Sequence, residues 1–345
     1  MLLQTIIPPT LLAQVPPQLA AQREFCNRWI SILRELSENC VIFFPGNCAV
    51  KNDYTVAIQN WPSKYKPRAV EIFSQLEKRN RFQEHSNPYL PCQVCSIPSC
   101  AQFLGLCASI QDSYYFTTST CFSCSLSQIT SERYVDTEDY SLSRFSIVRG
   151  QEFSHAIIDR QWNKSDFENR ILRPVLLTAK HVKIYDRYIG RSIEISNGVQ
   201  FSEKYKDTLQ WIAQIFANSG GIHRGGVFEV YCGYFVSRSF SFSRHLVRQE
   251  VSRVEADIRA LTGVPVKIFL KEESSNSECP HGRFLVTDQI SLSVERGFDI
   301  LWTIQRMRSN RLHPNRNPTP VRDITITRCE DCSSVEREFR TLPNF

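Results

Sequence analysis

The sequence lacks long apolar runs and a recognisable export signal. No stretch of its 345 residues approaches the roughly 20 apolar residues that a membrane-spanning helix requires. Residues 1–22 carry no charge, but prolines at 8, 9, 16 and 17 interrupt them, whereas a signal peptide combines a basic start with an unbroken apolar core. We therefore expect an extended N-terminal segment over 1–22 and a soluble, cytoplasmic protein with no membrane partner.

Glycine and proline are also few, and neither recurs with a period. The 13 Gly and 17 Pro exclude collagen-like and low-complexity chains. The 22 Phe, 12 Tyr and 5 Trp exclude a disordered chain, because so much aromatic surface drives collapse into a core. At about 100–200 residues per domain, the length predicts two domains or one large one. The net charge of +6 permits a polyanionic partner but does not require one.

The 13 cysteines are unevenly placed along the chain. An odd count argues against a complete set of disulfides, and the clustering favours metal binding in a reducing compartment. Zinc knuckles present two thiolates from one tight turn, and C-x2-C spacing occurs at three places: Cys92 and Cys95, Cys121 and Cys124, and, as an alternative half-site, Cys329 and Cys332. This pattern indicates a structural zinc. The alternative, that these are small buried apolar residues, stays open.

The spacing of apolar residues divides the first half of the chain into two segments. Residues 23–90 are typical of a mixed α/β N-terminal domain, with helices predicted over 25–36 and 66–78 and a strand over 40–44. Residues 91–149 are rich in Cys, Ser and aromatic side chains without a clear period. That composition predicts an irregular segment.

Residues 150–305 alternate between strand and helix patterns. Strands are predicted over 181–189, 227–235, 264–270 and 283–292, and helices over 205–216 and 246–261. A capping box, Ser165-Asp-Phe-Glu168, predicts the start of an earlier helix. Alternation of this kind is typical of an α/β fold built on one sheet. The remaining residues, 306–345, are predicted to form an arginine-rich tail that ends in the last C-x2-C pair.

One motif in this α/β region can carry chemistry. His281 and Arg283 follow the third predicted strand, and residues two apart on a strand project from the same face. An imidazole can attack phosphorus while a neighbouring cation holds the phosphate oxygens and stabilises the transition state. Asp288, seven residues after His281, is an acceptor that could orient the imidazole or brace the cation.

The spacing of His281, Arg283 and Asp288 resembles the H-x-K-x4-D signature of the phospholipase D superfamily, and the element order of 150–305 resembles its α/β module. The resemblance implies a phosphodiesterase, most simply a metal-independent nuclease that needs no cofactor for catalysis. His281 would form a phosphohistidine, and Arg283 would hold the phosphate. Relatives with this architecture recur in prokaryotic defence modules.

This chain departs from the family pattern in two ways. The family's lysine is replaced by Arg283, whose planar fork is larger than an ammonium group. Active members combine two motifs, and this chain has one complete copy. The resemblance therefore implies a homodimer in which His281 of the partner subunit protonates the leaving oxygen. The alternative, which both departures favour, is a non-catalytic phosphate- or nucleic-acid-binding module with a degenerate site.

Further residues are candidates for binding the substrate. Asp186 and Arg187 lie in the strand predicted from His181, and sheets of this class bind ligands beyond their strand ends. A salt-bridged strand terminus is the alternative. The tail carries Arg306, Arg308 and Arg311, and three later prolines favour an extended backbone. Extended arginine-rich segments suit phosphate backbones, so we predict nucleic acid as a partner, with a solvated linker as the alternative.

Overall fold

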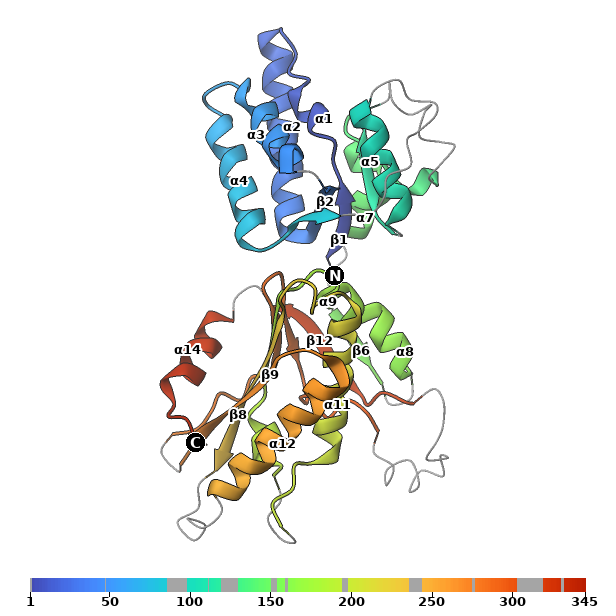
Figure 1. Ribbon diagram of the computed structural model, residues 1–345. Helices are drawn as coiled ribbons and strands as arrows, with labels where there is room; N and C mark the ends of the chain where they lie inside the picture. Colours follow the sequence, from blue (N-terminus) through green and yellow to red (C-terminus); the bar gives the residue numbers. More distant parts are fainter. Residues whose placement is uncertain are drawn as a thin grey trace. The chain divides into compact units, whose positions relative to one another are not determined.

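The computed structural model consists of two compact units, Met1–Glu152 and Phe153–Phe345 (Figure 1). The structure describes residues 2–46, 48–85, 98–110, 112–118, 130–149, 154–158, 161–193, 198–235, 244–274, 277–302, 319–329 and 332–345. The boundary falls close to the one that the sequence predicts at residue 150. Within the described part of the chain, no helix is long and apolar enough to cross a membrane.

The first unit contains a five-stranded parallel sheet in the order β3-β2-β1-β4-β5. The strands are β1 Leu3–Ile6, β2 Cys40–Pro45, β3 Phe82–His85, β4 Tyr114–Thr117 and β5 Tyr134–Asp136. The prediction of an extended segment over 1–22 is wrong, because after the central strand β1 these residues form the helix α1 Pro9–Ala13 and the start of a helix at Leu19. Leu3 and Ile6 of β1 are buried, and Pro9 begins the short helix α1, a position where proline loses no hydrogen bond.

Helices cover this sheet, and two of them were predicted. They are α2 Leu19–Asn39, α3 Cys48–Gln59, α4 Lys66–Lys78, α5 Pro98–Ser109 and α7 Arg144–Arg149. The predictions over 25–36 and 66–78 are confirmed, as is the strand over 40–44. The prediction of an irregular 91–149 is wrong for its described part, where α5, β4, β5 and α7 lie. β4, β5 and α7 have at most six residues, too few for a period to be visible in the sequence. The twelve residues of α5 are mostly apolar or small all round the helix, so no single apolar face is distinguished.

The second unit contains a seven-stranded mixed sheet in the order β6-β12-β11-β10-β7-β8-β9. Its parallel half consists of β7 His181–Tyr185, β8 Val227–Phe235 and β9 Val266–Glu273. The antiparallel half consists of β10 Phe284–Thr287, β11 Ser291–Val294, β12 Ile324–Cys329 and β6 Ser154–Ile157. An α/β fold is therefore confirmed at the level of mixed helices and sheets.

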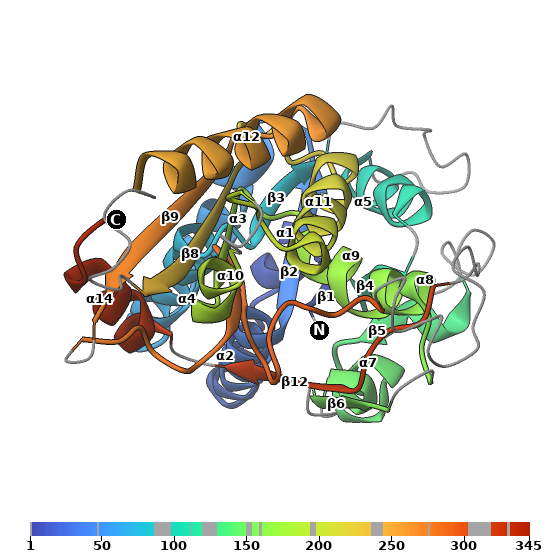
Figure 2. The same ribbon diagram turned by 90° about the horizontal axis from the view of Figure 1, so that it is seen from below.

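Helices lie on both faces of this second sheet. α11 Glu203–Asn218 and α12 Arg244–Thr262 follow β7 and β8 in the sequence, and Figure 2 shows α12 running along β8 and β9 with α14 Ser333–Thr341 on the opposite side of the strands. α11 and α12 confirm the helices predicted over 205–216 and 246–261. Gly263 ends α12 with φ of +71°, a left-handed conformation that favours glycine.

Two local predictions in this unit are corrected. The earlier helix is capped by Asn163 rather than Ser165, since Asn163 accepts from the Asp166 amide and Asp166 accepts from the Asn163 amide. That helix runs as α8 Lys164–Phe167, a π-helical turn over Glu168–Leu172 and α9 Arg173–Leu176. The strand predicted over 283–292 is a hairpin, β10 and β11, because the Thr287 amide donates to the Ile290 carbonyl and closes a turn.

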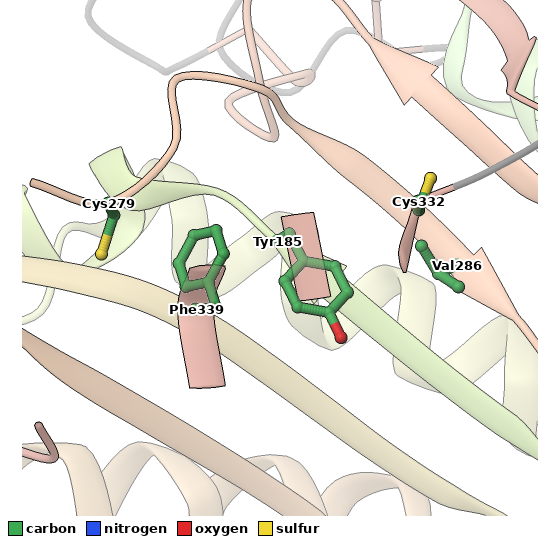
Figure 3. Packing of buried hydrophobic residues seen from close by; sticks show 5 residues of the cluster. All are labelled: Tyr185, Cys279, Val286, Cys332 and Phe339. Atoms are coloured by element: carbon green, nitrogen blue, oxygen red, sulfur yellow. The ribbon is translucent and has the colours of Figure 1, made fainter. Parts of the chain in front are cut away.

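The tail predicted over 306–345 is part of this fold where the structure describes it. β12 pairs with both β6 and β11, so it lies inside the sheet. On α14, the fully buried Phe339 packs against Tyr185 with a ring-centroid distance of 5.3 Å. Figure 3 shows these two rings beside each other and Cys332 beside Val286. The chain after residue 318 therefore completes the core.

Candidate active site at the carboxyl end of β7

Two residues of the predicted motif, His281 and Arg283, lie where β7 ends and α10 Arg187–Arg191 begins. β10 runs antiparallel to β7 with Phe284 opposite Tyr185, so Arg283 lies next to Asp186. The strand predicted over 181–189 ends at Tyr185, because Asp186 caps α10: its Oδ1 accepts from the Tyr188 amide at 2.9 Å. The structure thus brings together His281, Arg283 and the two candidates after β7.

Asp186 is fully buried at the centre of this junction. Its Oδ2 accepts from the Phe298 amide at 3.0 Å, and its Oδ1 lies 3.7 Å from Nε of Arg283. Burial raises the pKa of Asp186 to about 6, although the Tyr188 and Phe298 amides and Arg283 oppose the rise. Gly297 approaches the Asp186 carboxylate so closely that a Cβ atom there would overlap it. Asp186 therefore fixes α10, Arg283 and the turn at Gly297 together.

Arg187 is the most deeply buried cation of the site, with a side chain that is 0% exposed. Its Nη2 lies 3.1 Å from Glu273 Oε1 and 2.9 Å from Glu278 Oε2. Its Nη1 lies 2.8 Å from Nε2 of His281. Because a guanidinium nitrogen can only donate, Nε2 of His281 is the acceptor and the proton of a neutral imidazole is on Nδ1.

Arg191, one turn later on α10, completes an arginine–carboxylate network with Arg187, Glu273 and Glu278. Its Nε donates to Glu273 Oε2 at 2.6 Å, and its Nη2 donates to Glu278 Oε1 at 3.3 Å. Glu273 is fully buried and also accepts from the Cys279 amide at 2.7 Å. Burial raises the pKa of Glu273, and the Cys279 amide and Arg187 oppose the rise. Two arginines therefore share one buried carboxylate.

His281 and Arg283 differ in how far they are exposed. The His281 side chain is 74% exposed, whereas that of Arg283 is 25% exposed. Nε of Arg283 is buried and has no hydrogen-bond partner among the described residues. The guanidinium carbon of Arg283 lies 4.7 Å from the centre of the Tyr188 ring, a cation–π contact that holds the plane of the fork. Of the three arginines, Arg283 has the weakest pairing with a carboxylate, so it is the most available to an anion.

Asp288 lies at the opposite end of β10 from His281. Its Oδ1 accepts from the amides of Lys180 and His181, where β7 begins. The expectation that it orients His281 or braces Arg283 is therefore wrong. The four residues of β10 separate them, and the antiparallel pairing with β7 places the two ends of β10 beside opposite ends of β7.

Several predicted site residues lie outside the described residues. These are the arginines Arg306, Arg308 and Arg311 and the cysteines Cys92, Cys95, Cys121 and Cys124. Cys332 is buried in the cluster around Phe339, and Cys329 packs against the same cluster. Among the described residues, no group of three or more His, Cys, Asp or Glu side chains is arranged to hold a metal ion. The structural zinc therefore stays a prediction.

Sequence reasoning missed four members of the site: Tyr188, Arg191, Glu273 and Glu278. One signal was present, since Arg191 follows Arg187 by four residues, the spacing that places two side chains on one helical face. The carboxylates carried no such signal, because they lie more than 80 residues from their partners. In the site, three arginines contact three carboxylates next to the imidazole of His281. Another anion could replace one of these carboxylates.

Comparison with known proteins gives no match: no family model, no curated protein and no solved structure is similar to this chain.

Proposed function

We propose that the second unit binds phosphate groups of nucleic acid at Arg283 and His281 without hydrolysing them. The observation that carries this proposal is the 2.8 Å contact between Nη1 of Arg187 and Nε2 of His281. A phosphohistidine forms only when a ring nitrogen offers its lone pair to phosphorus. Here the lone pair of Nε2 is directed at a buried cation, and Nδ1 carries the proton. The imidazole is thus better suited to donating a hydrogen bond than to attacking.

The remaining geometry also favours binding over turnover. Asp288 accepts from backbone amides at the start of β7, at the far end of β10 from His281, so it does not orient the imidazole. Nε of Arg283 makes no hydrogen bond among the described residues, and its guanidinium group lies against the Tyr188 ring. Guanidinium groups bind phosphate oxygens in pairs. The resemblance of the motif to the phospholipase D superfamily supports a phosphate ester as the ligand. Nucleic acid is the source that we favour, given the arginines at 306, 308 and 311.

The proposal is tested with one binding and one activity measurement on the full chain. Fluorescence anisotropy with a short DNA oligonucleotide should show binding that weakens at least tenfold in Arg283→Gln. Arg173→Gln is the matched control, because this arginine is 48% exposed and pairs with Glu168 on another part of the unit. Equal affinities for the two variants would refute a phosphate site at Arg283.

Hydrolysis as a homodimer is the second candidate function, and the 74% exposure of the His281 side chain favours it. An imidazole so exposed can be reached by a second subunit, and rotation away from Arg187 would release Nε2. Hydrolysis of bis(p-nitrophenyl) phosphate in the presence of EDTA distinguishes the two functions. We expect none above background; activity that disappears in His281→Ala would overturn the binding proposal in favour of the nuclease.

The arginine-rich segment gives a separate prediction about nucleic acid. Each phosphate contact that is lost should flatten the dependence of log affinity on log salt by about one unit. Replacing Arg306, Arg308 and Arg311 with Gln should therefore reduce the slope by about three if all three contact phosphate. An unchanged slope would identify this segment as a linker.

A further inference from the structure

Glu278 holds the two arginines of α10 from the solvent side. One of its oxygens, Oε2, lies 2.9 Å from Nη2 of Arg187, and the other, Oε1, accepts from Nη2 of Arg191 at 3.3 Å. A phosphate group can contact two guanidinium groups in the same way, through two oxygens bonded to one atom. The Glu278 side chain is 47% exposed, so water can replace its contacts when it turns outward.

Neither arginine depends on Glu278 for its position. Glu273, which is fully buried, contacts Arg187 at 3.1 Å and accepts from Arg191 at 2.6 Å on the side away from solvent. Removal of the Glu278 carboxylate would therefore leave two anchored cations against one buried anion. The excess positive charge would face the place that Glu278 occupies.

The hydrogen bonding of Arg187 is incomplete although its charge is paired. Nε and Nη2 of this fully buried side chain make no hydrogen bond among the described residues, because the nearby carboxylate oxygens do not lie along the N–H directions. Buried donors of a charged group that make no hydrogen bond destabilise the protein. A tetrahedral anion offers oxygens in more directions than a planar carboxylate does, so it can satisfy donors that Glu278 leaves unpaired.

We propose that Arg187 and Arg191 form an anion site for a terminal phosphate group, and that Glu278 is its internal occupant, displaced when the phosphate binds. The inference rests on the proposed function, since the phosphate would enter beside His281 and Arg283. A phosphate monoester carries up to two negative charges near neutral pH, whereas the carboxylate carries one. The exchange therefore favours a chain end over an internal phosphodiester, which carries a single charge. In nucleic acid this means the 5′- or 3′-phosphorylated end.

The test compares Glu278→Gln with the wild-type protein for binding of inorganic phosphate by isothermal titration calorimetry. We expect the variant to bind phosphate at least tenfold more tightly, because the competing carboxylate is gone and the arginines stay anchored by Glu273. Glu272→Gln is the matched control: it is adjacent to Glu273 but pairs with Arg244 at the surface, and its affinity should equal that of the wild type. Glu278→Ala should reproduce the gain, which guards against an effect particular to the amide.

Two further variants separate this inference from the proposed function. Arg191→Gln combined with Glu278→Gln should abolish the gain, whereas Arg283→Gln combined with Glu278→Gln should retain most of it. The wild type should also bind a 5′-phosphorylated oligonucleotide more tightly than its 5′-hydroxyl counterpart. Unchanged phosphate affinity in both Glu278 variants would overturn the internal-occupant proposal, even if Arg283→Gln still weakens DNA binding. If the gain in phosphate affinity disappears in the double variant with Arg283→Gln but persists in the one with Arg191→Gln, the phosphate does not bind at α10, and the proposal is overturned as well.

Discussion

Replacement of Glu273 by Gln should be among the most destabilising single changes in the second unit. The carboxylate is fully buried and serves Arg187, Arg191 and the Cys279 amide. Glutamine preserves the shape and one acceptor oxygen but removes the charge, so the buried Arg187 loses one of its two carboxylate partners. Removing one member of a buried ion pair typically costs about 3–5 kcal/mol.

The structure places the expected loss at the lower end of that range. Glu278 still lies 2.9 Å from Nη2 of Arg187, and the amide oxygen of Gln can still accept from Cys279. The neutral amide also avoids the cost of burying a charge, the cost that raises the pKa of Glu273. We therefore expect a loss of about 3 kcal/mol in the free energy of unfolding of this unit. Hydrogen exchange in increasing urea, read by mass spectrometry on peptides of β8 and β9, reports this unit separately from the N-terminal one.

Glu272→Gln is the control for this measurement. Its side chain is 33% exposed and pairs with Arg244, which is 46% exposed, so the pair is worth at most about 1 kcal/mol. Adjacent carboxylates on one strand should thus differ by about 2 kcal/mol or more in their effect. Similar losses for the two variants would refute the reasoning, because Glu273 would then carry no more weight than a surface carboxylate.

Three other substitutions test separate parts of the site and its support. Asp186→Asn tests the raised pKa, because ionisation of Asp186 costs stability as the pH rises from its ordinary pKa of 3.8 through about 6. In urea titrations the wild type should lose about 2 kcal/mol relative to the variant between pH 4 and 7, and a constant difference would contradict this. Gly297→Ala should lower the free energy of unfolding by more than about 1 kcal/mol, because the new Cβ atom would overlap the Asp186 carboxylate. Gly198→Ala is the control, since φ is also positive there but a Cβ atom meets nothing within 4 Å, and equal losses for the two variants would show that only φ matters. Phe339→Ala should lower the free energy of unfolding, measured by thermal denaturation, by about 3–5 kcal/mol. A loss no larger than that caused by Phe235→Ala, at a side chain that is 47% exposed, would show that α14 packs only loosely on the sheet.

Much of the helical structure could be predicted from the sequence because the longer helices repeat apolar residues over several turns. In α2 the buried Phe25, Trp29 and Leu33 recur every four residues, and the same regularity defines α4, α11 and α12. β8 was equally visible as a nine-residue run. β1, β10 and β11 have four residues each, too few for a period of two to be distinguished from a turn or an unbroken strand.

The candidate site was predictable only where its residues are neighbours in the sequence. His281 and Arg283 lie two residues apart, so their shared position follows from strand geometry. The contact between Arg187 and His281 joins the start of α10 to a residue 94 positions later, and it depends on β10 pairing with β7 rather than with β9. No local pattern encodes that choice. The prediction for Asp288 failed for another reason: its spacing from His281 fits the family motif, but spacing alone does not show at which end of β10 the carboxylate makes its hydrogen bonds.

The position of β12 has a consequence for the order in which the second unit assembles during synthesis. β6 is the first strand of this unit to leave the ribosome, yet its partner β12 is the last, since Ser154 pairs with Thr327. Until the C-terminal residues emerge, β6 and the outer edge of β11 expose unpaired backbone groups, the kind of edge that promotes association between nascent chains. The sheet of the first unit, by contrast, is complete at Asp136. We therefore expect chains that end before residue 319 to aggregate through their second unit, while chains that include β12 close the sheet.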